Sequence, residues 1–540
     1  MSNNQKATMV KGSLWMSAGN LISRLIGAIY IIPWFMWMGE NGNTANALYS
    51  MGYNIYALFL LISSVGIPAA IAKQTAYYNA HHEYGIARKM FSTALKFMLV
   101  VGLLAATIMF FASGAIARGI GGGDELIPVM RSLSIAVLVF PSMSVIRGYF
   151  QGNNELAPVA ISNIFEQVVR VFYALLATFI IMRTLQGEFT TAVVHSTFAA
   201  FVGMLASFGV LFWFLRKQRR ILREKEERFG VNTMKINTKE LLGETIKQAI
   251  PFIIVGSGIQ LFRLVDQFSF IRIMEWQTTY TVEDLLVYYA MFSANPDKLT
   301  MVLIAFATSV SAAGLPLVTA NFTKGRKKAL AALVNNNIQL FLFIMLPAVF
   351  GVMVLAYPLY TVFYVPNALG ANLLFWTAFQ SLLLGYYMFA SNMLQGMSQN
   401  RNAVLYLAIG LVIKVASQIP LVSQFEVYGP LLATTLGFLV SCSLITWKVY
   451  QVSRFDVKLL ALRSTLLLVL AGIMFGVVFV LQGLLGTFLS FDERLTAFGV
   501  VVISGVIGGM VYGFLVLFTR IGEKLLGDKV KRLRVKLRLT

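Results

Sequence analysis

About fourteen apolar stretches of roughly twenty residues follow one another along this 540-residue chain. A helix needs about 20 residues to cross the ~30 Å hydrocarbon core of a bilayer. A soluble core could not bury a chain that is 58% hydrophobic and only 12% charged. The pattern predicts an all-α polytopic membrane protein with about 14 transmembrane helices. The stretches are centred near residues 25, 59, 101, 138, 170, 203, 256, 304, 342, 383, 412, 438, 475 and 507.

The basic residues are divided unevenly between the two sides that these spans define. With a cytoplasmic N-terminus, 32 of the 44 lysines and arginines fall on the cytoplasmic side, with Arg147 counted among them. Only Arg118, Arg183 and Arg494 fall on the other side. Cytoplasmic loops carry such an excess, so both termini are predicted in the cytoplasm. The same bias explains the net charge of +21 without nucleic acid, and the basic runs are expected to face water or anionic phospholipid headgroups.

Three short motifs recur along the chain at offsets of 239 to 248 residues. Such a repeat predicts two homologous halves of six spans each, related by an axis along the membrane normal, with a central cleft and alternating access. The repeated pairs are Gly19–Leu25 with Gly258–Leu264, Gly66–Pro68 with Gly314–Pro316, and Gln151–Gly152 with Gln395–Gly396.

The repeat also sets the expected domain organisation. We expect an N-lobe over residues 1–215 and a C-lobe over 244–451, joined by a basic cytoplasmic linker over 216–243. Spans 13 and 14, within 452–519, fall outside the repeat, and a basic cytoplasmic tail follows at 520–540.

Nine ionisable residues fall inside the predicted spans, where a charge costs several kcal/mol unless it meets a partner or a wet cavity. Seven are cations and two are anions, and this surplus of positive charge predicts a cavity for an anionic substrate. They are Arg24, Arg131, Glu166, Arg170, Arg263, Asp266, Arg272, Lys298 and Lys414.

Two of the cations are repeat equivalents. Arg24 and Arg263 lie on the first helix of each half, so we expect both to line the cavity and bind substrate. Snorkelling toward an interface is the alternative, and it suits Arg131 and Arg272 better because they lie nearer span ends.

The other charged positions allow two interpretations each. Lys298 follows Pro296, which predicts a substrate-facing position on a broken helix, with a local ion pair as the alternative. Glu166 and Arg170 are four residues apart, which favours an intrahelical ion pair over a coupling role, although Arg170 could still be released toward substrate.

The partner of the second carboxylate in the spans, Asp266, is also left open by the sequence. Asp266 pairs either with Arg263, with Lys414 or with a coupling ion. The three histidines of the chain have no ligand partner at metal-site spacing, so no metal site is predicted.

Enzyme signatures are missing from the sequence: it has no phosphate loop, no HExxH and no nucleophile with a positioned base. We therefore expect a transporter rather than an enzyme, with a membrane-embedded lipid transferase as the alternative of another class. Without a nucleotide-binding domain, transport would draw on an ion gradient or the membrane potential, and no cofactor is expected.

The stretches GNLISRLIGAIY, SVGIPAAIAK, IRGYFQGNNELAPVAISNIFEQVVRV and NMLQGMSQN resemble the MOP flippase superfamily. Within it they are similar to the YtgP/SpoVB-like polysaccharide-biosynthesis branch, which includes lipid II flippases of the MurJ type. The resemblance covers about residues 10–520. It implies a V-shaped central cavity, a groove for a lipid tail along spans 13 and 14, and export of an undecaprenyl-diphosphate-linked sugar.

The resemblance extends to some single residues. Arg24 matches a first-span arginine that the family needs, whereas Tyr30 stands where many relatives repeat an arginine. Lys298 lies close to a substrate-facing arginine of span 8, and Asp266 resembles a carboxylate of span 7 implicated in sodium binding. The acidic ligand of span 11 is not matched, and Lys414 stands in that helix instead.

The sequence thus predicts a monomeric flippase of the bacterial cytoplasmic membrane that exports lipid II for peptidoglycan synthesis. A flippase for another lipid-linked polysaccharide, of capsule or teichoic acid, would need the same polyprenyl diphosphate recognition. A multidrug antiporter of the same superfamily would more often have about twelve spans and an acidic cavity.

Overall fold

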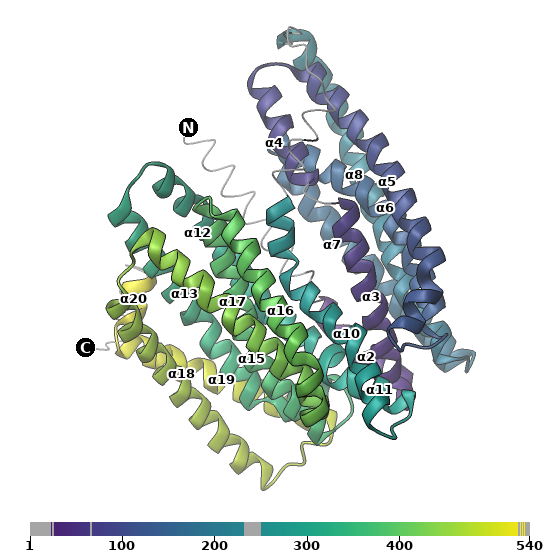
Figure 1. The fold of residues 1–540 in the computed structure, drawn as a ribbon, viewed down its shortest axis with the longest axis vertical. Coiled ribbons are helices and arrows are strands. Elements are labelled where there is room, and N and C mark those ends of the chain that lie inside the picture. The colour runs from purple at the N-terminus through teal and green to yellow at the C-terminus, as the bar shows by residue number, and fades with distance from the viewer. Residues whose placement is uncertain are drawn as a thin grey trace. The chain divides into compact units, whose positions relative to one another are not determined.

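The computed structural model describes residues 26–64, 67–229 and 250–526, with the single residues 23, 231, 243, 530, 532 and 534. Every regular element in this part of the chain is a helix, which confirms the all-α fold class. The helices form two compact units, Met1–Ala290 and Met291–Thr540 (Figure 1). The lobe boundary expected at 216–243 stays a prediction.

In the first unit, the long helices α5, α6 and α8 run side by side (Figure 1). Helix α7 packs along α8, and α10 and α11 lie against α3. The elements are α2 (Ile31–Met38), η1 (Gly39–Asn41), α3 (Gly42–Ser64), α4 (Ile67–Ala80), α5 (Tyr84–Gly119), α6 (Leu126–Gly152), α7 (Leu156–Phe179), η2 (Ile180–Thr184), α8 (Phe189–Phe229), α10 (Gly258–Gln277) and α11 (Val282–Tyr289).

In the second unit, α12 and α17 pack against α15, and α16 runs along α17. Helices α18 and α19 are attached through α13 and α14. The elements are η3 (Ala290–Ala294), which begins at the last residue of the first unit, α12 (Asn295–Thr323), α13 (Lys327–Val354), α14 (Ala356–Phe363), α15 (Ala368–Gly396), α16 (Asn400–Phe425), η4 (Glu426–Tyr428), α17 (Gly429–Ser453), α18 (Val457–Gly486), α19 (Arg494–Phe518) and α20 (Ile521–Leu526).

Local residues set several of these helix ends. The Asp456 carboxylate accepts a hydrogen bond from the backbone N–H of Leu459, and the Asn367 side chain accepts one from Gly370. Each satisfies a donor that the first turn of a helix leaves unpaired. Helix α17 ends because Arg454 adopts a left-handed conformation with φ of 53°. The connection between α17 and α18 is therefore short and sharply turned.

Eleven helical stretches in the described residues are long and apolar enough to cross a membrane. Two of these stretches, Ile26–Ser63 and Asn400–Ser453, each run through two α-helices joined by a short 3₁₀ turn, η1 and η4. Between 17% and 72% of each apolar window is buried inside the protein, so large apolar faces stay uncovered by protein. This is the pattern of helices whose outer faces contact lipid.

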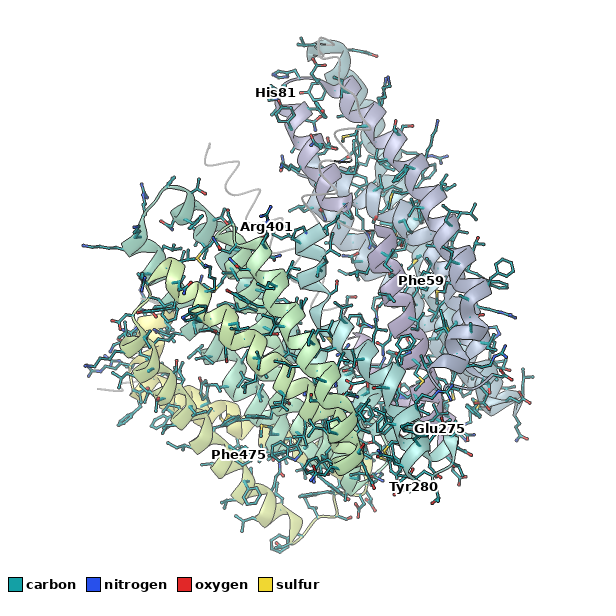
Figure 2. The ribbon with its side chains drawn as sticks, in the orientation of Figure 1. Phe59, His81, Glu275, Tyr280, Arg401 and Phe475 are labelled. Carbon is teal, nitrogen blue, oxygen red and sulfur yellow. The ribbon has the colours of Figure 1, made fainter. Side chains whose placement is uncertain are left out.

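The last two long helices are packed onto the second unit by apolar side chains. Leu470 and Met474 of α18 and Tyr512 of α19 form one buried cluster with Leu346 of α13. Phe475, labelled on α18 in Figure 2, adds an edge-to-face contact with Phe350. The helices outside the sequence repeat are therefore an integral part of this unit.

Candidate functional site

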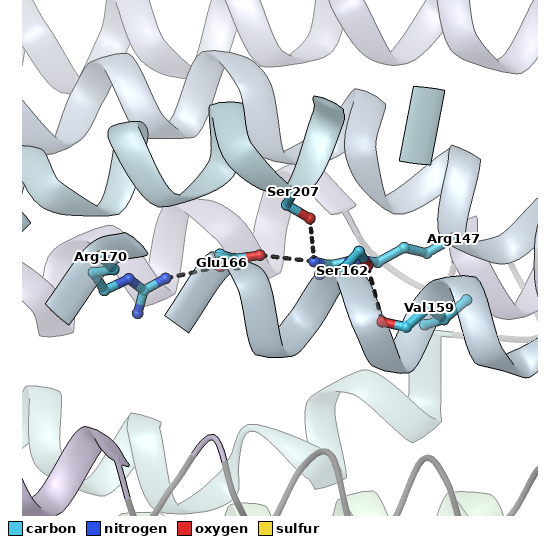
Figure 3. Close-up of polar contacts among 6 residues, drawn as sticks. All are labelled: Arg147, Val159, Ser162, Glu166, Arg170 and Ser207. Atoms are coloured by element: carbon cyan, nitrogen blue, oxygen red, sulfur yellow. Dashed lines mark hydrogen bonds and ion pairs between the residues drawn. The ribbon is translucent and has the colours of Figure 1, made fainter. Parts of the chain in front are cut away.

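A cluster of charged side chains lies inside the first unit where α6, α7 and α8 meet. One oxygen of Glu166 accepts a hydrogen bond from Arg147 at 2.7 Å, and the other accepts one from Arg170 at 2.8 Å. Arg147 also donates to the hydroxyl of Ser207 at 2.9 Å. Figure 3 shows Glu166 held between the two guanidinium groups. The three side chains carry a net charge of about +1.

The helices approach closely at this cluster because of a glycine. A Cβ atom at Gly203 of α8 would lie 2.6 Å from the backbone oxygen of Glu166 and 3.0 Å from Cβ of Arg170. The three charged side chains keep only 14%, 12% and 22% of their surface exposed, for Arg147, Glu166 and Arg170 in turn. The ion pairs thus lie largely inside protein.

Arg147 lies within α6, five residues before the last residue of the helix, and its assignment to the cytoplasmic side stays a prediction. It therefore belongs to a candidate span, Leu126–Gly152. The (i, i+4) spacing pointed to Arg170 as a partner of Glu166, but nothing in the sequence pointed to Arg147, which lies on another helix.

Three tyrosines of α3 extend the polar interior of this unit. The rings of Tyr49 and Tyr53 stack with centroids 4.6 Å apart, and Tyr56 meets Tyr53 edge to face at 5.4 Å. Tyr53 and Tyr56 lie within electrostatic reach of Arg170. Phenol hydroxyls can donate hydrogen bonds to an oxyanion, so the cluster is bordered by further donors.

Polar contacts also join α10 to α3. The side-chain amide of Gln260 donates to the Asn54 carbonyl and side chain at 3.2 and 3.1 Å, and Gln267 donates to the carbonyl of Met51 at 3.0 Å. Arg263 and Asp266 lie on α10 between these two glutamines. Arg263 is half-buried and Asp266 is buried. The contacts with α3 thus fix the segment of α10 that carries both.

The helix that carries Lys298 is interrupted just before it. A five-residue π-helical segment, η3, separates α11 from α12. Asn295, the first residue of α12, is fully buried and donates through its side chain to the hydroxyl of Tyr360 at 2.8 Å. Lys298 follows one turn later and is half-buried. The break lies before Pro296 rather than after it.

Lys414 lies inside the second unit and has no exposed surface. Its ammonium group donates to the backbone carbonyl of Pro430, at the start of α17, at 2.9 Å. A buried ammonium needs such oxygen ligands because its desolvation is costly. The contact brings α16 and α17 together at one point.

Three other predicted positions differ in their surroundings. Arg24 lies outside the described residues. Arg131 donates to the hydroxyl of Ser113 at 3.3 Å and stacks on Phe110, whereas Arg272 is more than half exposed and pairs with Glu275 at 3.4 Å. In the part of the chain that the structure describes, no group of His, Cys, Asp and Glu residues could hold a metal ion.

Comparison with known proteins identifies the family of this chain. The model of the polysaccharide biosynthesis protein family matches residues 9–322, more than half of the chain. The chain belongs to this family. Within it, the chain is 34% identical to the lipid II flippase MurJ of Bacillus subtilis (strain 168) over 518 residues, covering 93% of this chain and 94% of the relative. It is also 26% identical to the stage V sporulation protein B of that strain, over one third of each chain.

Solved structures agree on the fold of this member of the polysaccharide biosynthesis family. A lipid II flippase MurJ in an inward closed conformation matches 95% of the chain and 100% of its own, with a TM-score of 0.64 and 13% identity. An inward-facing multidrug resistance MATE family transporter of the MOP superfamily matches 83% of this chain and 98% of its own, with a TM-score of 0.62 and 14% identity. The predicted fold and family are confirmed, and the relatives named here are transporters, not enzymes.

Proposed function

We propose that this protein is a flippase that moves undecaprenyl-diphosphate-linked sugar, most specifically lipid II, across the bacterial cytoplasmic membrane. One observation carries the proposal: the 34% identity to a lipid II flippase extends over 93% of this chain and 94% of the relative. A match over nearly the whole of both chains extends beyond the repeated part.

The transport path that we propose has fourteen spans. The described residues contain eleven candidate stretches. Dividing Ile26–Ser63 at η1 and Asn400–Ser453 at η4 adds two, and α10 with the residues before it supplies the fourteenth. An even number supports two cytoplasmic termini, in keeping with the distribution of 32 basic residues against 3.

The binding chemistry rests on surplus positive charge in the spans. Arg24, Arg263 and Lys298 would bind the diphosphate, because charge-assisted hydrogen bonds to phosphoryl oxygens offset part of its dehydration. The half-buried positions of Arg263 and Lys298 support this role, since each side chain keeps some surface that a substrate can reach. Binding of the anion would lower the repulsion among these cations and make closure of the cavity less costly.

The energy source that we propose is the membrane potential. An inside-negative potential favours outward movement of an anion by roughly 2.3 kcal/mol per charge per 100 mV. The Lys414 ammonium already donates to a backbone carbonyl at 2.9 Å in the interior of the second unit. Lys414 stands in the helix where the family resemblance expects an acidic ligand, and a fixed cation there favours a cycle without a coupling ion.

Two further features of the proposal concern the surroundings of the protein. The basic runs of the sequence, at 216–228 and 529–538, would contact anionic phospholipid headgroups, where each lysine or arginine contributes about 1 kcal/mol. The protein would act as a monomer, because the sequence repeat already supplies the two lobes that a central cleft requires.

Complementation tests the proposal most directly. Expression in a cell depleted of its own lipid II flippase should restore growth and cell shape. Normal membrane levels without rescue would contradict the lipid II assignment, and the same chain would then be tested in strains lacking a capsule or teichoic acid flippase. Within a rescuing chain, Arg24→Ala should abolish flipping of labelled lipid II, whereas unchanged flipping would remove Arg24 from the binding site.

A further inference from the structure

We propose that Arg170, which shares Glu166 with Arg147, forms a second phosphoryl-binding subsite inside the first unit. Its ligand is a phosphoryl oxygen of the polyprenyl diphosphate, and Glu166 is the counter-ion that this oxygen replaces on Arg170. The inference rests on the proposed function and deepens it, because this subsite is additional to Arg24, Arg263 and Lys298.

The first argument is the balance of hydrogen-bond donors and acceptors in the cluster. Two guanidinium groups offer about ten N–H donors. Against these, the described residues provide the two oxygens of Glu166 and the hydroxyl of Ser207 as acceptors. The Nε atoms of Arg147 and Arg170 are buried and find no acceptor among the described residues. A cluster with surplus buried donors and a net positive charge is suited to an additional anionic acceptor.

The second argument is the unequal attachment of the two arginines. Arg147 is held at two points, by Glu166 and by Ser207, and keeps 14% of its side-chain surface exposed. Arg170 makes one side-chain hydrogen bond in the described part of the chain, to Glu166, and keeps 22% exposed. Glu166 can therefore stay bound to Arg147 while an incoming oxyanion takes its place on Arg170.

The third argument is the depth of Arg170 along its helix. Arg170 lies fourteen residues after Leu156, the first residue of α7, which is about 21 Å along the helix. Arg147 lies only five residues from the last residue of α6, about 7.5 Å along that helix. The two cations therefore lie at successive depths, with Glu166 between them. A subsite at the depth of Arg170 would act while the headgroup crosses the membrane, not when it first enters.

A purely structural role for the ion pairs would explain Glu166 and one arginine but not the second arginine. One arginine would neutralise Glu166, and the second leaves a cation inside a span, where each charge costs several kcal/mol. The planar fork of an arginine matches a phosphoryl group in two-point contacts.

The test measures binding of undecaprenyl diphosphate to the full chain in phosphatidylcholine nanodiscs, for the unmodified protein and for Arg170→Gln, Arg170→Lys, Glu166→Gln and Arg131→Gln. We expect Arg170→Gln to weaken binding roughly tenfold and Arg170→Lys to weaken it less. Glu166→Gln should tighten binding, because it removes the competing anion. Arg131 serves as the matched control, since it is an arginine of α6 outside the cluster, and Arg131→Gln should leave binding unchanged.

Three outcomes would overturn the subsite. The first is an equal affinity of Arg170→Gln and Arg131→Gln for undecaprenyl diphosphate. The second is weaker binding by Glu166→Gln when its thermal stability is unchanged. Equal competition by phosphatidylglycerol would identify a general headgroup site, whereas competition by inorganic pyrophosphate alone supports recognition of the diphosphate. If the unmodified chain binds no undecaprenyl diphosphate and flips no lipid II, the proposed function itself fails. If it does both and only the variants disagree, the subsite alone fails.

Discussion

The hydroxyl of Tyr364 donates a hydrogen bond to the backbone carbonyl of Asn295 at 2.6 Å. Arg494, at the start of α19, donates in turn to the carbonyl of Tyr364 at 2.9 Å. Tyr360 of α14 and Tyr364, the residue that follows α14, thus both contact Asn295, the first residue of α12. Through Arg494, helix α19 is linked in this way to the start of α12, one turn before Lys298.

This link predicts that Tyr364→Phe affects both stability and transport. Removing the hydroxyl deletes one buried hydrogen bond, which contributes about 1 kcal/mol to the free energy of unfolding. It also frees the start of α12, so we expect slower flipping of labelled lipid II because Lys298 is less well positioned. Thermal unfolding of the purified protein and flipping in proteoliposomes measure the two effects.

Tyr357→Phe is the matched control, because Tyr357 lies on the same short helix and donates to Asp492 at 2.5 Å at an exposed site. Its loss should change stability less and leave flipping unaltered. If both substitutions slow flipping equally, the contact with Asn295 has no special role.

A second prediction concerns the contact between α16 and α17. A Cβ atom at Gly410 would collide with the side chain of Ser441 and the carbonyl of Gly437. Gly410→Ala should therefore destabilise the protein by about 1–3 kcal/mol through overpacking. Gly472→Ala, at a helix position where a Cβ meets nothing within 4 Å, should not. Equal melting temperatures for the two variants would contradict the close approach of these helices.

Much of the helical framework was predictable, because the length and hydropathy of a span are local properties of the sequence. The repeat offered a further local signal. Arg170 lies fourteen residues after the start of α7, and Lys414 lies fourteen residues after the start of α16. The Gln-Gly pairs that suggested their equivalence end α6 and α15.

The partners of these charges were less predictable, because they depend on packing between helices. The second partner of Glu166 is Arg147, on a different helix, and no spacing rule connects them. Lys414 donates to a backbone carbonyl, a group that every residue carries and that leaves no mark in the sequence. Pro296 indicated a broken helix, but the break lies in η3 just before it, and the sequence offers no signal for π-helical turns.

A third prediction uses the glycine beside the Glu166 cluster. Gly203→Val would force α8 away from the backbone of Glu166 and from Cβ of Arg170, since even a Cβ there is too close. We expect slower flipping and lower stability. Gly209→Val, on the same helix with nothing within 4 Å of its Cβ, provides the control. Normal flipping by Gly203→Val would show that the geometry of the cluster is unimportant for transport.

A fourth prediction concerns pH and the residue just before α6. Burial, followed by the negative charges of Glu283 and Glu188, raises the pKa of the Glu125 carboxyl above its ordinary value. The folded protein therefore binds this proton more tightly than the unfolded chain does. The charged form costs stability at neutral pH, and this cost disappears as the pH falls below the ordinary pKa.

Other carboxylates titrate in the same range, so the effect of Glu125 is isolated by comparing the unmodified protein with Glu125→Gln. The variant should melt at a higher temperature at pH 7, because glutamine carries no charge near Glu188 and Glu283. Its advantage should shrink as the pH is lowered toward the ordinary carboxyl pKa, because the folded unmodified protein takes up its proton on Glu125 before the unfolded chain does. Glu40→Gln, at an exposed position in η1, controls for the loss of a surface carboxylate. A constant difference between Glu125→Gln and the unmodified protein at every pH would mean that charge at this position is not what limits stability.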